Sequence, residues 1–277
     1  GDKYPEVSIK LYSGIYYLES RGYRPEEIFR IGKTLKNKAK RYYTVDNSIY
    51  ENRKSAGNVI DKEAGILNRG NLTRLKNFLN RAAQGERLTV GFIGGSITQG
   101  FAATAPDKCY AARTVAWLRK VFPNTEFDYV NAGIGATNSQ FGAARVQEDL
   151  LCRLPDLVMV EFSVNDHCTP HDMETYEGLI RQIYGSRSCP AMVLLHSVYY
   201  DTGKSAAYYH AQIGRHYDLP CISMQNSIYP AVAAGRLPAE KITADFLHPN
   251  DLGHEFMVAV IMNFLEKVIH DLSLIHI

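Results

Sequence analysis

The stretch Leu88–Gly100 reads LTVGFIGGSITQG and joins an apolar run to two glycines, a serine and a polar turn. The apolar run predicts a buried strand over Leu88–Ile93. The glycines directly before Ser96 permit tight backbone geometry and would leave the serine hydroxyl exposed at the end of the strand. A nucleophilic serine is expected in such a setting, although Gly-Gly-Ser also forms ordinary turns. The nucleophile elbow of α/β-hydrolases is excluded, because Thr98 stands where that motif requires its second glycine.

From this strand onward, short apolar runs alternate with longer amphipathic stretches, which is typical of a parallel sheet covered by helices on both faces. Strands are predicted at Leu88–Ile93, Glu126–Val130, Leu157–Phe162, Ala191–Ser197 and Pro220–Met224. Helices are predicted at Tyr110–Val121, Ser139–Leu151, Met173–Tyr184, Ser205–Tyr217 and about Leu252–His270. The predicted fold is therefore α/β, a flavodoxin-like three-layer α/β/α sandwich with a five-stranded parallel sheet. In such sheets ligands bind beyond the carboxyl ends of the strands.

The first 87 residues differ in charge from the rest of the chain. They contain 18 Lys and Arg against 10 Asp and Glu, whereas the whole chain of 277 residues carries 31 against 29. Two helices are predicted there, at Pro25–Lys40 and at Asn71–Ala83. We therefore expect a basic, mainly helical N-terminal extension over residues 1–87 and a second domain over residues 88–271. The segment 272–277, LSLIHI, resembles a translated adapter, so a non-native tail is expected.

Composition also excludes several classes of function. A net charge of +2 argues against a general attraction to nucleic acid, and no nucleic-acid-binding motif accompanies the basic segment. No apolar run reaches the roughly 18 residues of a membrane span. The five cysteines are scattered, which fits neither a disulfide framework nor a zinc site. We expect mostly buried thiols, no metal and no cofactor. Scattered cysteines favour a reducing compartment such as the cytoplasm, and secretion stays open.

A serine hydroxyl is a weak nucleophile until a base takes its proton. The segment Ala244–His254, ADFLHPNDLGH, supplies a carboxylate and a histidine three residues apart. Asp245 could accept a hydrogen bond from one ring nitrogen of His248 while the other nitrogen faces Ser96. His254 is the competing histidine, but its position in the final predicted helix favours a packed or surface role.

Acyl transfer also needs hydrogen-bond donors directed at the developing oxyanion. Asn165 lies in SVND, just beyond the predicted strand that contains VMVEF. The segment Asn131–Ser139, NAGIGATNS, follows another strand, and its small residues allow backbone N–H groups to approach a ligand. Four further polar residues end or follow strands and could line a cleft or pack in the core: Asp166, His167, His196 and Ser197.

In this order and setting, Ser96, the NAGIGAT loop, Asn165 and His248 resemble the four sequence blocks of SGNH (GDSL-like) hydrolases. The resemblance covers about residues 88–271. It implies a catalytic triad of Ser96, His248 and Asp245. It also implies an oxyanion hole made by the Ser96 N–H, one backbone N–H of the second block and Asn165.

Two positions depart from the family pattern. Gly95 stands where the GDS signature has aspartate, and that aspartate is not a member of the triad. Ala136 stands where the family commonly has its oxyanion glycine, directly after Gly135. Either residue could therefore supply the N–H of the second block.

The stretches GGSITQG, NAGIGATNSQFGAARVQEDLL and VEFSVND are especially similar to bacterial carbohydrate esterases that deacetylate plant polysaccharides such as mannan or xylan. This resemblance implies a serine esterase that hydrolyses small acyl esters, chiefly acetyl esters, on a carbohydrate through an acyl-enzyme on Ser96. An acylated carbohydrate is then the expected partner. Two alternatives stay open: an acyltransferase or a lipid- or thioester-directed esterase on the same scaffold, and a non-catalytic carbohydrate-binding protein.

Overall fold

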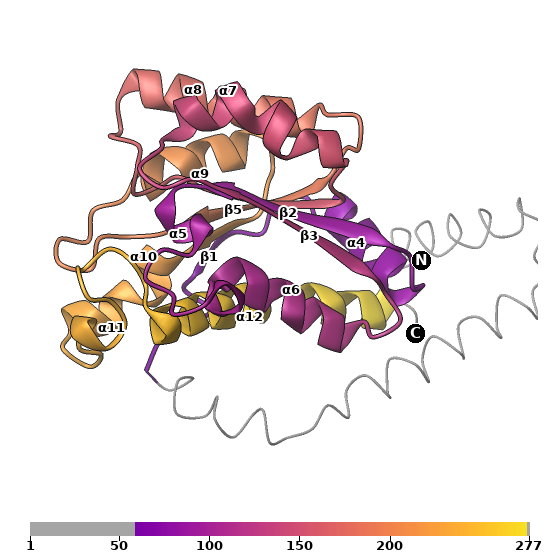
Figure 1. Cartoon of the computed structure of the whole chain (residues 1–277). Helices are drawn as coiled ribbons and strands as arrows, with labels where there is room; N and C mark the ends of the chain where they lie inside the picture. The colour runs from indigo at the N-terminus through magenta and orange to yellow at the C-terminus, as the bar shows by residue number, and fades with distance from the viewer. Residues whose placement is uncertain (1–58, 276–277) are drawn as a thin grey trace, which may run out of the picture. The chain divides into compact units, whose positions relative to one another are not determined.

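The computed structural model describes residues 59–275, and residues 59–269 belong to one compact unit. The predicted helix Pro25–Lys40 lies outside the described residues. At the centre of the unit is a six-stranded sheet in the order β1-β6-β5-β4-β2-β3 (Figure 1). The strands are β1 (Ile66–Asn68), β2 (Leu88–Gly94), β3 (Phe127–Gly133), β4 (Leu157–Glu161), β5 (Ala191–His196) and β6 (Cys221–Ser223).

The five predicted strands are confirmed as β2 to β6, and they pair in parallel. The prediction of a purely parallel five-stranded sheet is wrong at one edge, where β1 pairs with β6 in the antiparallel direction. β1 has three residues, all partly buried, and so short a segment carries no readable alternation of apolar and polar side chains.

Helices cover both faces of the sheet, as predicted. Figure 1 shows α7, α8 and α9 on one side and α6 and α12 on the other. The bounds of the longer helices are α4 (Thr73–Ala83), α6 (Tyr110–Val121), α7 (Ser139–Asp149), α8 (Pro170–Tyr184), α9 (Ala207–His216) and α12 (Asp251–Ile275). The short ones are α5 (Ser96–Gln99), α10 (Met224–Ser227) and α11 (Tyr229–Ala233), with 3₁₀ turns at Pro106–Lys108, Leu151–Arg153 and Ala239–Lys241.

Successive side chains of β2 pack against the helices on opposite faces of the sheet. Ile93 joins a buried cluster with Val146 of α7 and Leu179 of α8. Its neighbour Phe92 packs edge-on against Tyr110 of α6, with ring centroids 5.9 Å apart. Successive side chains of a strand point to opposite faces, so a strand covered by helices on both sides reads as one continuous apolar run.

Elements before residue 88 belong to the same sandwich. Phe78 of α4 packs on Phe127 of β3, with ring centroids 6.3 Å apart, and β1 extends the sheet. The division expected near residue 87 is therefore corrected. Within α4, Leu75, Phe78, Leu79 and Ala82 are buried, whereas Arg74, Lys76 and Arg81 are partly exposed. At the other end, α12 continues through residue 271 to Ile275, so the segment expected as a tail begins inside a helix.

Two further expectations concern the described residues alone. No helix within residues 59–275 combines the length and the apolar character that a bilayer crossing requires. All five cysteines are free thiols, but only Cys109 and Cys221 are buried, and Cys152 and Cys189 are exposed. The expectation of mostly buried thiols is thus wrong for these two exposed residues.

Candidate active site

Three polar segments meet at one edge of the sheet because their strands are parallel neighbours. β2 ends at Gly94, directly before Ser96, and β4 ends four residues before Asn165. β3 ends at Gly133, and the loop that follows contains Ala136. The carboxyl ends of β3, β2 and β4 lie side by side in the sheet order, which is the edge where ligands bind in this class of fold.

The structure brings the predicted nucleophile, base and carboxylate together. Ser96 Oγ lies 2.8 Å from His248 Nε2, and His248 Nδ1 lies 2.5 Å from Asp245 Oδ2. Because a carboxylate only accepts hydrogen bonds, the proton sits on Nδ1, and Nε2 is free to accept from the serine hydroxyl. Ser96 is 9% exposed, so its hydroxyl lies just below the surface.

The competing histidine has another role. His254 is fully buried, and its Nδ1 accepts a hydrogen bond from the Tyr110 backbone N–H at 3.2 Å. Burial lowers the pKa of His254 to about 4, so its imidazole is neutral at physiological pH. It packs α12 against α6, as the sequence reading favoured.

A closed loop holds the carboxylate in place. Asp245 Oδ1 accepts hydrogen bonds from the hydroxyl of Thr243 and from the backbone N–H groups of Leu247 and His248. An isolated bridge between Thr243 and Pro249 ties the two ends of the loop together. Burial by itself would raise the pKa of Asp245, but the hydrogen bonds from His248, Leu247 and Thr243 outweigh it and hold the pKa well below its ordinary value. The group therefore stays a carboxylate at physiological pH.

The glycine that replaces the family's aspartate lies against Asn165. A Cβ atom at Gly95 would come within 2.5 Å of Asn165 Oδ1, which is closer than packed atoms allow. As the backbone stands here, a side chain at position 95 would push Asn165 away. The close approach of Asn165 therefore explains why glycine fits at position 95.

The geometry separates the two candidates for the backbone donor of the second block. The Gly135 N–H donates to Gln99 Oε1 at 2.9 Å. Among the residues that the structure describes, none accepts a hydrogen bond from the N–H of Ala136 or Ser96. Ala136 also adopts the left-handed backbone conformation, with φ of 57°, the region in which glycine is at ease. Of the two candidates, Ala136 is therefore the one whose N–H has no acceptor among the described residues.

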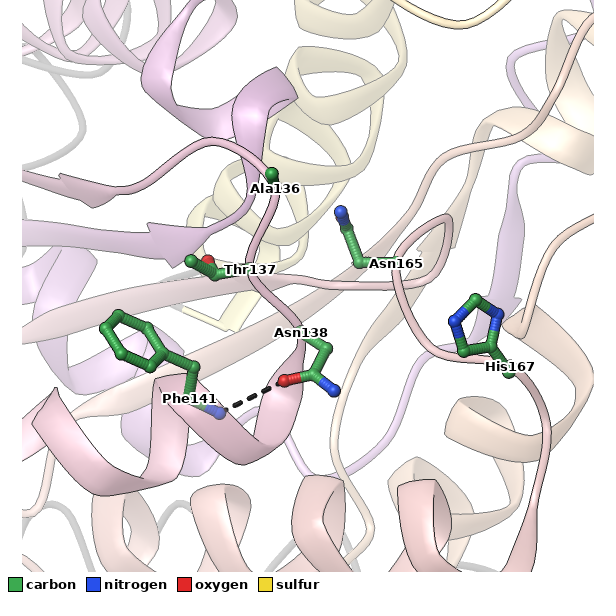
Figure 2. Close-up of a pocket in the computed structure, with 6 residues that line it drawn as sticks. All are labelled: Ala136, Thr137, Asn138, Phe141, Asn165 and His167. Atoms are coloured by element: carbon green, nitrogen blue, oxygen red, sulfur yellow. Dashed lines mark hydrogen bonds between the residues drawn. The ribbon is translucent and has the colours of Figure 1, made fainter.

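A pocket of about 500 Å³ opens beside these donors. Figure 2 shows the Asn165 side-chain nitrogen projecting from the loop after β4 on the side where Ala136 lies. The pocket is lined by Ala136, Thr137, Asn138, Phe141, Asn165 and His167. Of the four further cleft candidates, only His167 lines it. His196 and Ser197 are buried in the core, at 0% and 3% exposure.

A buried polar network that the sequence did not reveal stands behind this pocket. Asp166 Oδ1 accepts from the Ser139 N–H at the start of α7, and Oδ2 lies 2.9 Å from His210 Nε2 of α9. His210 stacks on Tyr176, with ring centroids 3.5 Å apart. Burial lowers the pKa of His210 despite the opposing effect of Asp166, so the neutral ring donates to the carboxylate. His210 is 44 residues from Asp166 in sequence, and no local motif signals the contact.

A serine, a histidine and a carboxylate at the carboxyl edge of a three-layer α/β/α sandwich are the arrangement of a serine hydrolase. The chain belongs to the GDSL-like Lipase/Acylhydrolase family, whose model matches residues 92–256. Membership of this lipase and acylhydrolase family confirms the class of enzyme expected from the sequence, a carboxylic ester hydrolase. Among curated proteins, no match was found.

Solved structures support the same fold. The two-domain esterase CEX, described as active on acetylated mannans and co-crystallised with mannopentaose, is 53% identical with a TM-score of 0.75. The alignment covers 76% of this chain and 58% of CEX, so the chain spans less than two thirds of that relative. Axe2, an acetyl xylan esterase from Geobacillus stearothermophilus, has the same fold at 20% identity and a TM-score of 0.54, covering 64% of this chain and 94% of Axe2.

Proposed function

We propose that this protein is a serine esterase that removes acetyl groups from a carbohydrate, with a plant mannan or xylan as the substrate class. The observation that carries the proposal is the unbroken hydrogen-bond chain from Ser96 Oγ through His248 to Asp245. A serine hydroxyl paired with an oriented imidazole is what a two-step acyl transfer requires.

In the first step, Ser96 Oγ attacks the acetyl carbonyl carbon while its proton passes to His248 Nε2. The resulting oxyanion collapses, the bond to the sugar oxygen breaks, and that oxygen leaves with the proton held on Nε2. In the second step, a water molecule attacks the acyl-enzyme, gives its proton to Nε2, and acetate departs as Ser96 recovers its proton. Asp245 remains a carboxylate and stabilises the imidazolium in both steps.

Three donors serve the oxyanion in this proposal: the N–H groups of Ser96 and Ala136 and the side-chain amide of Asn165. None of these donors has an acceptor among the described residues, so each is free to bind the developing charge. Removing a single donor of this kind costs about 10²–10³ in rate. Gly135 has a supporting role, because its bond to Gln99 fixes the loop.

The substrate class is supported by similarity and by the shape of the site. CEX, at 53% identity, is described as acting on acetylated mannans. The pocket beside the donors is lined mainly by the polar side chains of Thr137, Asn138, Asn165 and His167, with Ala136 and Phe141 as its apolar members. Such a surface suits a hydroxyl-rich ligand better than a long acyl chain, which needs an apolar tunnel.

Acetate release tests the proposal. Wild type and Ser96→Ala are compared on acetylated mannan, acetylated xylan and a medium-chain p-nitrophenyl ester. We expect acetate release from at least one polysaccharide and its loss by a factor of about 10⁴ or more in the variant. A clear preference for the medium chain would point to a lipid-directed esterase instead, and no wild-type activity on any ester would point to a non-catalytic binding protein.

A further inference from the structure

An exposed aromatic ring lies directly beside the base. The rings of Phe101 and His248 have centroids 4.5 Å apart at an interplanar angle of 59°. Phe101 is nevertheless 57% exposed. A ring in this position offers an apolar face to a ligand that approaches the base.

The backbone of the nucleophile holds this ring in position. The N–H groups of Phe101 and Gly100 both donate to the carbonyl of Ser96, at 2.9 and 3.1 Å. Gly100 adopts φ of 95°, and a Cβ atom there would lie 2.7 Å from the Cβ of Cys109. The backbone turn that places Phe101 at the surface therefore requires glycine at position 100. Its hydrogen bonds to the Ser96 carbonyl fix it relative to the nucleophile.

The far side of the same loop is also fixed. Asp251, at the start of α12, accepts hydrogen bonds from the N–H and the hydroxyl of Thr104 and from the Lys108 ammonium group, at 2.7 to 2.9 Å. Asp251 follows His248 by three residues. The segment carrying Phe101 is thus joined at one end to the nucleophile and at the other to the histidine loop.

The chemistry of ester cleavage determines which part of the substrate lies next to the Phe101 ring. The oxygen that leaves in the first step takes its proton from His248 Nε2, so it must come within hydrogen-bond distance of that nitrogen. The alcohol that carries this oxygen is then next to Phe101, whereas the acyl carbonyl faces Asn165 and Ala136. We propose that Phe101 is a sugar-stacking subsite that binds the apolar C–H face of the sugar ring carrying the acetyl group.

This inference rests on the proposed function. It adds Phe101 as a residue that recognises the alcohol part of the ester. A phenyl ring offers no hydrogen bond, so its gain comes from covering apolar surface on both partners. A pyranose ring provides such a surface on one face, and a short aliphatic alcohol does not. Phe101 therefore discriminates between esters by their alcohol and leaves the chemistry to Ser96 and His248.

The test compares two acetate esters on the full chain. Phe101→Ala is measured for acetate release from acetylated manno-oligosaccharides and from ethyl acetate, whose alcohol cannot stack. We expect KM for the oligosaccharides to rise about 3- to 10-fold with little change in kcat, which corresponds to the usual value of one aromatic contact. The rate on ethyl acetate stays within about 2-fold of wild type, and Phe101→Tyr keeps the wild-type KM on both.

Leu154→Ala is the matched control. Leu154 is 49% exposed and precedes β4, at the edge of the sheet opposite the site. Its loss removes a comparable exposed apolar group and leaves both KM values unchanged. If Phe101→Ala slows both esters equally, the ring positions His248 and the proposal is overturned. It is also overturned if KM for the oligosaccharides does not change. A wild-type chain that hydrolyses ethyl acetate but no acetylated sugar defeats the proposed substrate class instead.

Discussion

The backbone conformation of Ala136 supports its proposed role as an oxyanion donor. Its φ of 57° lies where a residue with a side chain pays about 1–2 kcal/mol relative to the right-handed region. Such strain persists only where the surroundings impose it. Here the neighbouring Gly135 N–H is bonded to Gln99, which fixes the loop directly before Ala136. The strained residue is thus the one whose N–H is proposed as an oxyanion donor.

A prediction at the level of single residues concerns Glu161 and the pH dependence of the free energy of unfolding. This fully buried carboxyl ends β4, and burial raises its pKa to about 7 despite hydrogen bonds from Ser163. In the unfolded chain the group loses its proton near pH 4.5. Between these values the folded state binds the additional proton, so the free energy of unfolding falls as pH rises toward 7 and levels off above it, by about 3 kcal/mol in total.

Denaturant unfolding of wild type and Glu161→Gln between pH 5 and pH 8 measures this effect. The variant cannot titrate at this position, so the stability difference between the two proteins should shift in its favour as pH rises. Asp245 has the opposite tendency because its pKa is lowered, but it is present in both proteins and cancels. A constant difference across the range would show that Glu161 is ionised in both states.

At the scale of elements, Asp166 joins the start of α7, the loop after β4 and α9 through Ser139 and His210. Two of these elements adjoin the proposed oxyanion donors. Asp166→Ala should therefore lower kcat by about 10-fold or more with a small effect on KM, because such donors act mainly in the transition state. Asp166→Asn, which can still accept from the Ser139 N–H, should recover part of kcat. Loss of thermal stability with kcat unchanged would make the network merely structural.

The pattern of apolar and polar residues was enough to predict the strands, helices and loops that position the candidate site. Five of the six strands, both helical layers and the order of the polar loops follow from apolar runs and strand ends. The spacing of Asp245 and His248 places both on one loop, which the structure closes with a bridge. The missed features depend on contacts distant in sequence. Gly135 and Ala136 can be told apart only through Gln99, 36 residues away, and β1 is defined by its pairing with β6.

At the scale of the whole molecule, residues 59–87 should be indispensable. They supply the edge strand β1 and the helix α4, which buries Leu75, Phe78, Leu79 and Ala82. Losing the burial of three large apolar side chains costs about 5 kcal/mol, which is comparable with the total stability of a domain. A chain of residues 88–277 should therefore unfold at a much lower temperature than one of residues 59–277, or fail to fold. Equal melting temperatures for the two chains in calorimetry would contradict this.

The closed loop that carries Asp245 and His248 has a consequence for how the protein acquires activity. These two residues are three apart in sequence, whereas Ser96 and His248 are 152 apart. Short loops close in about 100 ns or less, but distant contacts wait for the chain to assemble. The carboxylate of Asp245 and the imidazole of His248 can therefore meet early in folding, while Ser96 joins them only when β2 has paired into the sheet. Regain of ester hydrolysis during refolding thus reports complete assembly of the chain's topology.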